Sequence, residues 1–150
     1  MELENVKLKL YGKECEFKVS FYDDEHIKPV QWEALKRFLC CSEDLLAAVE
    51  EPLRQFCLEV NQNWFYNYGD DETGNAQDMI PEDYEGKLTD VFRVLTPIEL
   101  YIEDSEKCCR WDNRRIAALV FEHRFRADDE LMVVFRDEQF YSICWDWEFA

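Results

Sequence analysis

The C-terminal fifth of the chain, residues 115–147, constrains the fold most strongly, because three apolar stretches follow one another with only short polar breaks. The first stretch, residues 116–125, begins with six consecutive apolar side chains, which is typical of a β-strand covered on both faces. A tight turn at Asp137-Glu138 separates the second stretch, residues 131–135, from the third. The pattern predicts an antiparallel meander whose apolar face the rest of the chain has to cover.

The third strand is predicted over residues 139–147, where large apolar side chains recur at every second position. Alternate side chains of a strand share one face of a sheet. The side chains expected on that shared face are Tyr141, Ile143, Trp145 and Trp147. We expect Ile143 to lie in the core, together with Phe121 of the first strand.

Alternating apolar and polar residues near the N-terminus predict a β-hairpin. A turn at Gly12-Lys13, with glycine first, suits the type II′ geometry that joins two antiparallel strands. The register that follows places Leu10 opposite Cys15, Leu8 opposite Phe17, and Val6 opposite Val19, with Lys9 facing Glu16. The three apolar pairs are then expected on one face of the hairpin.

Helical spacing follows the hairpin. Pro29 suits the first turn of one helix, whose apolar residues recur as far as Leu39. Cys40-Cys41-Ser42 interrupts the spacing, and Ser42 is well placed to cap a second helix. Apolar residues three or four positions apart define that second helix over residues 45–64, and Pro52 predicts a kink or a break within it.

Regular periodicity is lost over residues 66–89, which form one long acidic segment. Loops longer than about 12–15 residues within a compact domain are usually functional or mobile. Residues 91–103 are again strand-like. Pro97 predicts an edge position for that strand, because proline cannot donate a backbone hydrogen bond.

These elements predict a single α+β domain over residues 1–150. It has an N-terminal β-hairpin, two or three helices and a C-terminal antiparallel meander, with the helices packed on one face of the sheet. No apolar run approaches the roughly 20 residues that a membrane span needs, and the acidic N-terminus is unlike a signal peptide. The sequence therefore predicts a cytoplasmic protein.

The net charge is −17, from 34 acidic and 17 basic residues. Such a chain repels nucleic acid phosphates and anionic membranes, so the sequence predicts neither as a partner. It attracts basic proteins, and it also dissolves well. The charge alone is equally consistent with a dedicated basic partner and with solubility as its only role.

Patterns of catalytic residues are sparse. The two histidines, His26 and His123, have no sequence context that makes them bases for a nucleophile, and no serine lies in a Gly-x-Ser-x-Gly elbow. The seven cysteines include the adjacent pairs Cys40-Cys41 and Cys108-Cys109, and their spacing fits neither a disulfide framework nor a metal site. Glycine-rich phosphate loops are missing. The sequence therefore predicts no enzyme activity, no catalytic residue, no cofactor and no metal.

The acidic segment nevertheless leaves a metal-binding alternative. Residues 70–75 resemble a calcium loop superficially, but they lack its ligand spacing and its terminal glutamate. Glu85-Gly86-Lys87 has the Glu-x-Lys spacing that some metal-dependent nucleases use. A small metal-dependent hydrolase using the carboxylates between Asp70 and Glu85 is the enzyme alternative.

Aromatic residues run directly into this acidic segment. Rings that fill pockets, beside carboxylates that steer encounter, are the composition of a surface that grips a basic protein. Trp64 is expected to complete the helix core. The residues predicted to contact the partner are Tyr66, Tyr68, Asp70, Asp71, Glu72, Glu82, Asp83 and Glu85.

Residues 98–103, 116–121 and 130–136 resemble small bacterial immunity-protein-like domains that accompany contact-dependent and polymorphic toxin systems. The resemblance implies an α+β domain with an N-terminal hairpin, a helical middle and a C-terminal meander. It also implies a role in neutralising a toxin. The chain departs from that pattern at Asp128-Asp129-Glu130, where those domains have an acidic-His-Gly turn.

The resemblance and the charge together predict a non-enzymatic protein that binds a basic, nuclease-type toxin. The acidic segment would occlude the positively charged substrate cleft of the toxin. Two alternatives remain: a DNA mimic that inhibits DNA-binding proteins, and the metal-dependent hydrolase.

Overall fold

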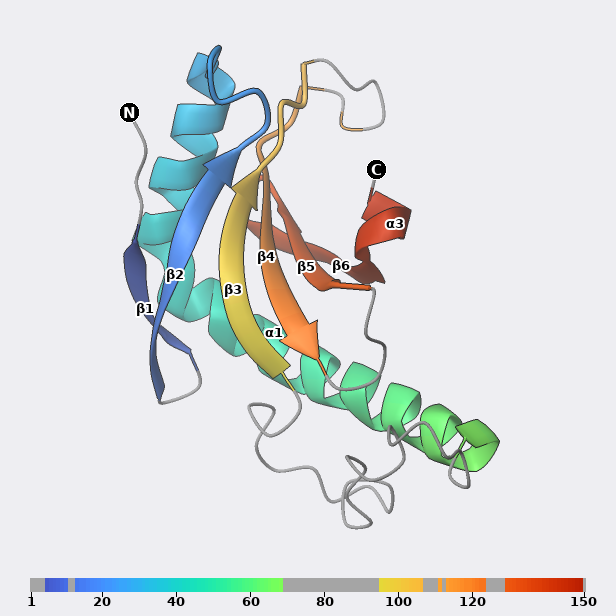
Figure 1. The fold of residues 1–150 in the computed structure, drawn as a ribbon. Helices are drawn as coiled ribbons and strands as arrows, with labels where there is room; N and C mark the ends of the chain where they lie inside the picture. Colours follow the sequence, from blue (N-terminus) through green and yellow to red (C-terminus); the bar gives the residue numbers. More distant parts are fainter. Residues whose placement is uncertain are drawn as a thin grey trace.

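The computed structural model describes residues 5–10, 13–68, 95–106, 111, 113–123 and 129–149, with the backbone alone for residues 13, 61–68 and 147. This part of the chain is an α+β fold built on a six-stranded sheet (Figure 1). The elements in chain order are β1 (Val6–Leu10), β2 (Lys13–Phe21), α1 (Pro29–Tyr68), β3 (Leu95–Ile102), β4 (Ile116–His123), β5 (Leu131–Arg136), β6 (Gln139–Trp145) and α3 (Asp146–Phe149).

The strands lie in the sheet in their order along the chain, from β1 to β6. The meander of β4, β5 and β6 is antiparallel, as predicted. The sheet as a whole is mixed, because β2 and β3 pair in parallel. A parallel pair needs a long crossover connection, and α1 lies in the connection between these two strands.

The prediction that the first strand of the meander is covered on both faces is confirmed. In β4 the side chains from Ile116 to Phe121 are all buried. Ala117, Leu119 and Phe121 belong to the larger core, which also contains α1. Ile116, Ala118 and Val120 belong to a second core on the opposite face, with Phe149 of α3. We call that opposite face the pocket face.

Helix α1 covers the other face of the sheet, and Figure 1 shows it running behind the strands. Its apolar stripe packs on the inner side chains of the strands, with Phe38 and Phe135 ring centroids 5.2 Å apart. The stripe consists of Ala34, Leu35, Phe38, Leu45, Leu46, Val49, Leu53, Cys57 and Leu58. The prediction that all helices pack on one face is wrong for α3, which contributes Phe149 to the pocket face.

The predicted break into two helices is also wrong, because α1 is continuous over 40 residues. Ser42 is not a cap. It occupies a buried position within the stripe, and its hydroxyl donates to the carbonyl of Leu39 at 3.2 Å. Pro52 lies inside the helix, and Figure 1 shows α1 changing direction between its two halves. Proline removes one helical hydrogen bond and crowds the preceding turn, which supplies a cause for a bend.

The N-terminus of α1 is fixed to the sheet by Gln31, which is fully buried. Its Oε1 accepts a hydrogen bond from the backbone N–H of Lys28 at 2.8 Å, as the third residue of a capping box does. Its Nε2 donates to the carbonyls of Tyr22 at 2.9 Å and Ile102 at 3.4 Å. The ends of β2 and β3 are therefore held to the start of the helix.

Strand β3 is central in the sheet, contrary to the edge position predicted from Pro97. Pairing with β2 begins only at Glu99, so Pro97 faces the neighbour β4 alone. The register with β4 shifts between Pro97 and Glu99. The missing N–H of proline is thereby placed at an irregularity, which is where a central strand tolerates it.

The predicted hairpin is present, but its register differs by two residues. Leu8 pairs with Cys15, Val6 pairs with Phe17, and Lys9 faces Glu14. Leu10 is paired directly with Lys13, so Lys13 belongs to β2 and not to the predicted turn at Gly12-Lys13. A shift of two keeps every side chain on its predicted face, because strand side chains alternate with a period of two.

The turn at Asp137-Glu138 is confirmed between the paired residues Arg136 and Gln139. Both turn residues have positive φ, 50° and 59°, as a type I′ hairpin turn requires. The Arg115 side chain holds this turn through two hydrogen bonds to the Glu138 carboxylate, at 2.8 and 2.9 Å. The backbone N–H of Arg115 also donates to Asp137 Oδ1 at 3.0 Å.

The predicted face of β6 is correct for Ile143 and Trp145, which pack with the larger core. It is wrong for Tyr141, which contacts Trp111 at a ring distance of 5.9 Å. The register between β5 and β6 shifts at Val134/Phe135, and such a shift exchanges the faces of the side chains beyond it. Trp147 lies outside the strand, because β6 ends at Trp145 and α3 begins at Asp146.

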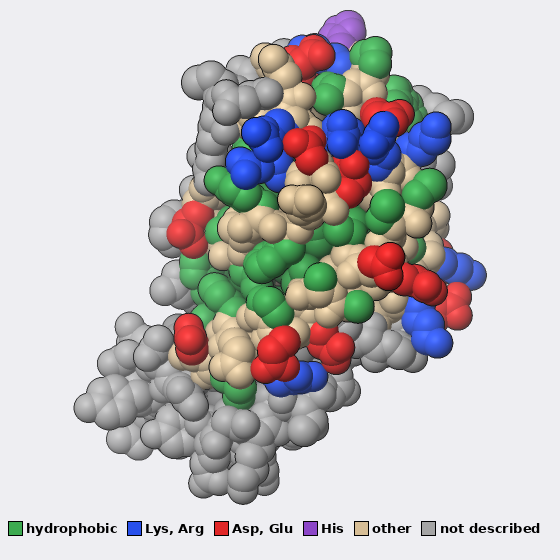
Figure 2. Space-filling model, turned by 180° about the vertical axis from the view of Figure 1, so that it is seen from behind, with side chains coloured by type: hydrophobic (Ala, Val, Ile, Leu, Met, Phe, Trp, Pro, Cys, Tyr) green, Lys and Arg blue, Asp and Glu red, His purple; other side chains and the backbone are tan. Residues whose placement is uncertain are grey.

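Figure 2 views the molecule from behind, on the side of α1, where lysine and arginine side chains gather in a band with acids among them. Two arginines of the described chain are ion-paired: Arg37 contacts Glu33 at 2.6 Å, and Arg114 contacts Asp137 at 3.6 Å.

Among the described cysteines, Cys40, Cys41 and Cys57 are free thiols. Burial raises the pKa of the Cys57 thiol to about 12, so this group is a core residue and not a nucleophile. Cys108 and Cys109 lie outside the described residues. Within the described part of the chain, no helix is long and apolar enough to cross a membrane.

Candidate functional site

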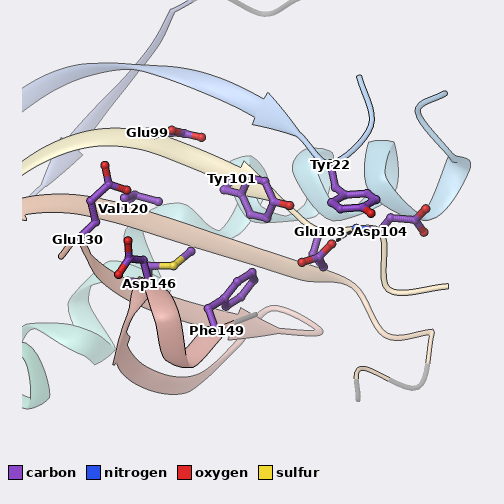
Figure 3. Close-up of a pocket in the computed structure, with 10 residues that line it drawn as sticks. Tyr22, Glu99, Tyr101, Glu103, Asp104, Val120, Glu130, Asp146 and Phe149 are labelled. Atoms are coloured by element: carbon purple, nitrogen blue, oxygen red, sulfur yellow. Dashed lines mark hydrogen bonds between the residues drawn. The ribbon is translucent and has the colours of Figure 1, made fainter. Parts of the chain in front are cut away.

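A pocket of about 450 Å³ opens on the pocket face, between the strand ends and α3 (Figure 3). Three aromatic rings, two aliphatic or thioether side chains and five carboxylates line it. The lining residues are Tyr22, Glu99, Tyr101, Glu103, Asp104, Val120, Glu130, Met132, Asp146 and Phe149.

Strand β3 supplies one wall by its alternation. Leu100 and Ile102 point into the larger core and are fully buried. Glu99 and Tyr101 occupy the alternate positions of the strand, Glu103 follows its last residue, and all three line the pocket (Figure 3). One strand thus carries an apolar face toward α1 and an acidic, aromatic face toward the pocket.

The floor and the far wall are apolar. Val120 of β4 and Met132 of β5 are both buried in the second core. Phe149 of α3 stands against Tyr101, with ring centroids 5.8 Å apart, and against Trp111 at 5.4 Å. These contacts hold the ring of Phe149 in position, where it forms one side of the cavity.

Helix α3 is positioned by a local cap. The Glu148 carboxylate accepts a hydrogen bond from the backbone N–H of Trp145 at 3.0 Å, three residues before it. The backbone N–H of Asp146 donates to the carbonyl of Glu130 at 2.9 Å. The first contact starts the helical turn and the second joins it to the segment before β5, so Asp146 and Glu130 are brought to the same end of the pocket.

Electrostatic repulsion is concentrated at that end. Burial raises the pKa of Glu130, and the carboxylates of Asp146 and Glu99 raise it further. Lys18 lies 3.8 Å from the Glu99 carboxylate, but its side chain is largely exposed, so this pair offsets little of the local negative charge.

The opposite end of the pocket contains Tyr22, Glu103 and Asp104. Asp104 is only 1% exposed, and Lys28 Nζ lies 3.1 Å from its carboxylate. The hydrogen bond to Asp104 is the main cause that raises the pKa of Lys28. Glu103 Oε1 accepts the backbone N–H of Asp104 at 2.9 Å, drawn as the dashed line in Figure 3.

Burial raises the pKa values of two side chains in this wall. Burial is the first cause that raises the pKa of Glu103, and the charge of Asp104 adds to it. Burial and then the charge of Glu103 raise the pKa of the Tyr101 hydroxyl. The Tyr101 hydroxyl therefore stays protonated at neutral pH and remains a hydrogen-bond donor.

Glu103→Gln is expected to stabilise the fold at pH 7. The folded-state pKa is raised above the usual 4.5, so the stability contribution of Glu103 falls as the pH rises from about 4.5 through the folded pKa. The uncharged amide removes this penalty and still accepts the N–H of Asp104. Thermal melts should show a gain of about 1–3 °C at pH 7 and no gain near pH 4. A lower midpoint at pH 7 would contradict the burial of this carboxylate.

The predicted partner contacts fall outside the side chains that the structure describes. Tyr66 and Tyr68 belong to the last turns of α1, where the backbone alone is described. The six predicted acids lie outside the described residues altogether: Asp70, Asp71, Glu72, Glu82, Asp83 and Glu85. That predicted surface stays a prediction.

The sequence reasoning missed the pocket, although β3 carries a readable signal. Glu99-x-Tyr101-x-Glu103 places two acids and a ring on one face of a strand whose other face is apolar. Such alternation ordinarily indicates a solvated face of a sheet; here α3 covers part of that face, and the polar residues line a recess. Tyr22, Glu130 and Asp146 come from three other segments and have no shared sequence pattern.

His123 is a packed residue at the rim of the sheet. Its Nε2 lies 2.5 Å from the carbonyl oxygen of Asp129, and its ring contacts Trp145 at 5.0 Å. In the described ranges, no three histidine, cysteine or acidic side chains are grouped to hold a metal ion. The carboxylates of the metal-binding alternative, from Asp70 to Glu85, lie outside those ranges.

Residues 2–143 match the family model described as "Domain of unknown function (DUF6985)". No curated protein and no solved structure matches the chain.

Proposed function

The chain belongs to the DUF6985 family, and we propose that it is a non-catalytic domain that binds a basic partner protein. Basic side chains of the partner bind at the pocket, where the carboxylates at its two ends meet their positive charge. The apolar floor receives the aliphatic stems of these side chains.

One observation supports this proposal above the others: five carboxylates line a single recess that also has an apolar floor and aromatic walls. Carboxylates that raise the pKa of a neighbour are stabilised when a cation binds between them. Rings such as Tyr22, Tyr101 and Phe149 attract a cation placed over their faces. An anionic ligand would meet repulsion from every charged group of the lining.

The partner class that fits best is a basic toxin. The net charge of −17 favours rapid encounter with a positively charged protein. The resemblance of residues 98–103, 116–121 and 130–136 to immunity-protein-like domains points the same way. By this hypothesis the domain neutralises a nuclease-type toxin by covering its cationic substrate cleft.

The pocket and the predicted acidic segment have different roles in this hypothesis. The pocket binds basic side chains of the partner and supplies short-range contacts. Tyr66, Tyr68 and the six acids between Asp70 and Glu85 would add a second contact and long-range attraction. Carboxylates at the rim of an interface change the association rate more than the dissociation rate.

Chemical-shift mapping tests the location of binding. The ¹⁵N-labelled protein is titrated with a capped tetra-arginine peptide at about 0.15 M salt, where charges more than about 8 Å apart are largely screened. We expect the largest shifts at Glu99, Tyr101, Glu130 and Asp146. The exposed acids Glu43 and Asp44 of α1 serve as an internal control and should barely move.

A tetra-glutamate peptide is the matched negative probe and should shift none of these signals. Shifts from the arginine peptide that cluster on α1, with the pocket signals unchanged, would refute the proposed site.

A further inference from the structure

The carboxylates of the pocket form two separate groups. Figure 3 shows Glu99, Glu130 and Asp146 toward one end, and Glu103 and Asp104 toward the other. The electrostatic couplings agree with this division. Asp146 and Glu99 raise the pKa of Glu130, whereas Asp104 raises that of Glu103.

The space between the two groups is apolar. Tyr101 and Phe149 stand between them in Figure 3, and their ring centroids are 5.8 Å apart. Val120, which Figure 3 draws beside Glu130, and Met132 also line the pocket and are buried in the second core. A ligand that spans the pocket must therefore be apolar in its middle, because this section offers a polar group little beyond the Tyr101 hydroxyl.

Neither end is neutralised by its own lysine. Lys28 pairs with both Asp104 and Glu106, at 3.1 and 3.3 Å, so one cation faces two acids there, and Glu103 adds a third. At the other end Lys18 contacts Glu99 through an exposed side chain. Among the described residues carboxylates thus outnumber lysines at both ends, and a single cation can meet only one of the two groups.

We infer that the pocket recognises an elongated dication, with two positive groups joined by an apolar chain, in place of a single charge. This inference rests on the proposed function and specifies its ligand. Two sources carry this chemistry: a linear polyamine, and a pair of basic side chains on one segment of the partner protein.

A length series of straight-chain diamines tests the inference. Calorimetry compares each α,ω-diamine, from four to twelve carbons, with the monoamine of the same chain length at constant ionic strength. Matched chains bury the same apolar surface, so the difference isolates the second charge. We expect an optimum length at which the diamine binds about ten-fold or more tightly than its monoamine.

Single-site variants locate the two charges. Glu103→Gln and Glu130→Gln should each reduce the best diamine to about the affinity of the monoamine. Glu43→Gln, an equal change of charge on the exposed face of α1, is the control and should leave the diamine preference unchanged. Because the amides keep the size of the carboxylates and relieve repulsion between neighbouring negative charges, loss of folding is not expected.

The two sources are separated with peptides. Capped peptides carrying two arginines, with zero to four glycines between them, are compared with peptides in which one arginine is alanine. If the spacing matters for peptides and the diamines bind weakly, the ligand is a partner segment. If the diamines bind tightly and the peptides do not, the ligand is a polyamine.

The outcomes also distinguish this inference from the function on which it rests. Equal affinity of diamine and monoamine at every length would overturn the two-ended pocket, while tetra-arginine shifts at the pocket would still uphold partner binding. A diamine optimum without any peptide at the pocket would uphold the dication site and overturn the basic protein as its partner.

Discussion

Phe121→Ala is expected to lower the free energy of unfolding by about 3–5 kcal/mol, which is the usual cost of removing a fully buried phenylalanine side chain. Phe121 is 0% exposed in the larger core. Phe121 belongs to β4, which is paired on both sides. Its own partners are Pro97 of β3 and Leu131 of β5. A cavity at this position cannot be filled by shifting an edge strand, so most of the lost packing is not recovered.

The measurement is urea unfolding of the wild type and the variant, with equal slopes required for the comparison. Ile143→Ala is the graded control. Ile143 was also expected in the core, but it is only partly buried on β6 at the end of the sheet. It should therefore cost about 1–2 kcal/mol, less than a fully buried position. Equal losses for the two variants would contradict the assignment of β4 to the centre of the core.

Strand patterns were readable from the sequence wherever the ladder is regular. The apolar run of β4 and the alternation in β1 and β2 gave the correct faces, because alternation depends only on local geometry. The register of the strand pairs was not predicted correctly in the hairpin or between β5 and β6. The hairpin is shifted by two residues, and the irregularity at Val134/Phe135 moves Tyr141 to the other face.

The error in α1 has one physical cause. The sequence pattern predicts Ser42 as the cap of a second helix, whereas Ser42 is a polar residue at a core position of one continuous helix. Leu35, Phe38, Ser42, Leu45 and Val49 follow one another at steps of three and four, so the stripe continues through Ser42. The hydroxyl of Ser42 is satisfied by the carbonyl of Leu39, which allows it to be buried inside the helix.

The pocket depends on tertiary pairing that no local pattern encodes. Glu99 and Glu103 could be placed on one face of a strand from alternation alone. Their meeting with Glu130 and Asp146 follows from the strand order and from the turn into α3 after Trp145. Glu148 carries the local signal for that turn, because it accepts the N–H of Trp145, three residues before it.

The second large effect concerns binding. Replacing three pocket carboxylates, as Glu103→Gln, Glu130→Gln and Asp146→Asn, removes negative charge from both ends of the pocket while keeping the size of each side chain. Hydrogen bonds to charged groups contribute about 1.5–3 kcal/mol each and are not additive. We therefore expect the affinity for the tetra-arginine peptide to fall by about 100-fold.

The matched control carries the same change of net charge on the exposed face of α1, as Glu43→Gln, Asp44→Asn and Glu59→Gln. Long-range attraction depends on net charge, which both variants change equally. Only a specific site responds to where the charge is removed. Thermal melts of both variants verify that each is folded at the temperature of the titration.

Calorimetric titration of these two variants and the wild type with tetra-arginine at about 0.15 M salt is the most direct test of the pocket as a cation site. We expect a loss of about 100-fold for the pocket variant and less than about three-fold for the control. Equal losses in both variants, or wild-type affinity in the pocket variant, would contradict cation binding in the pocket.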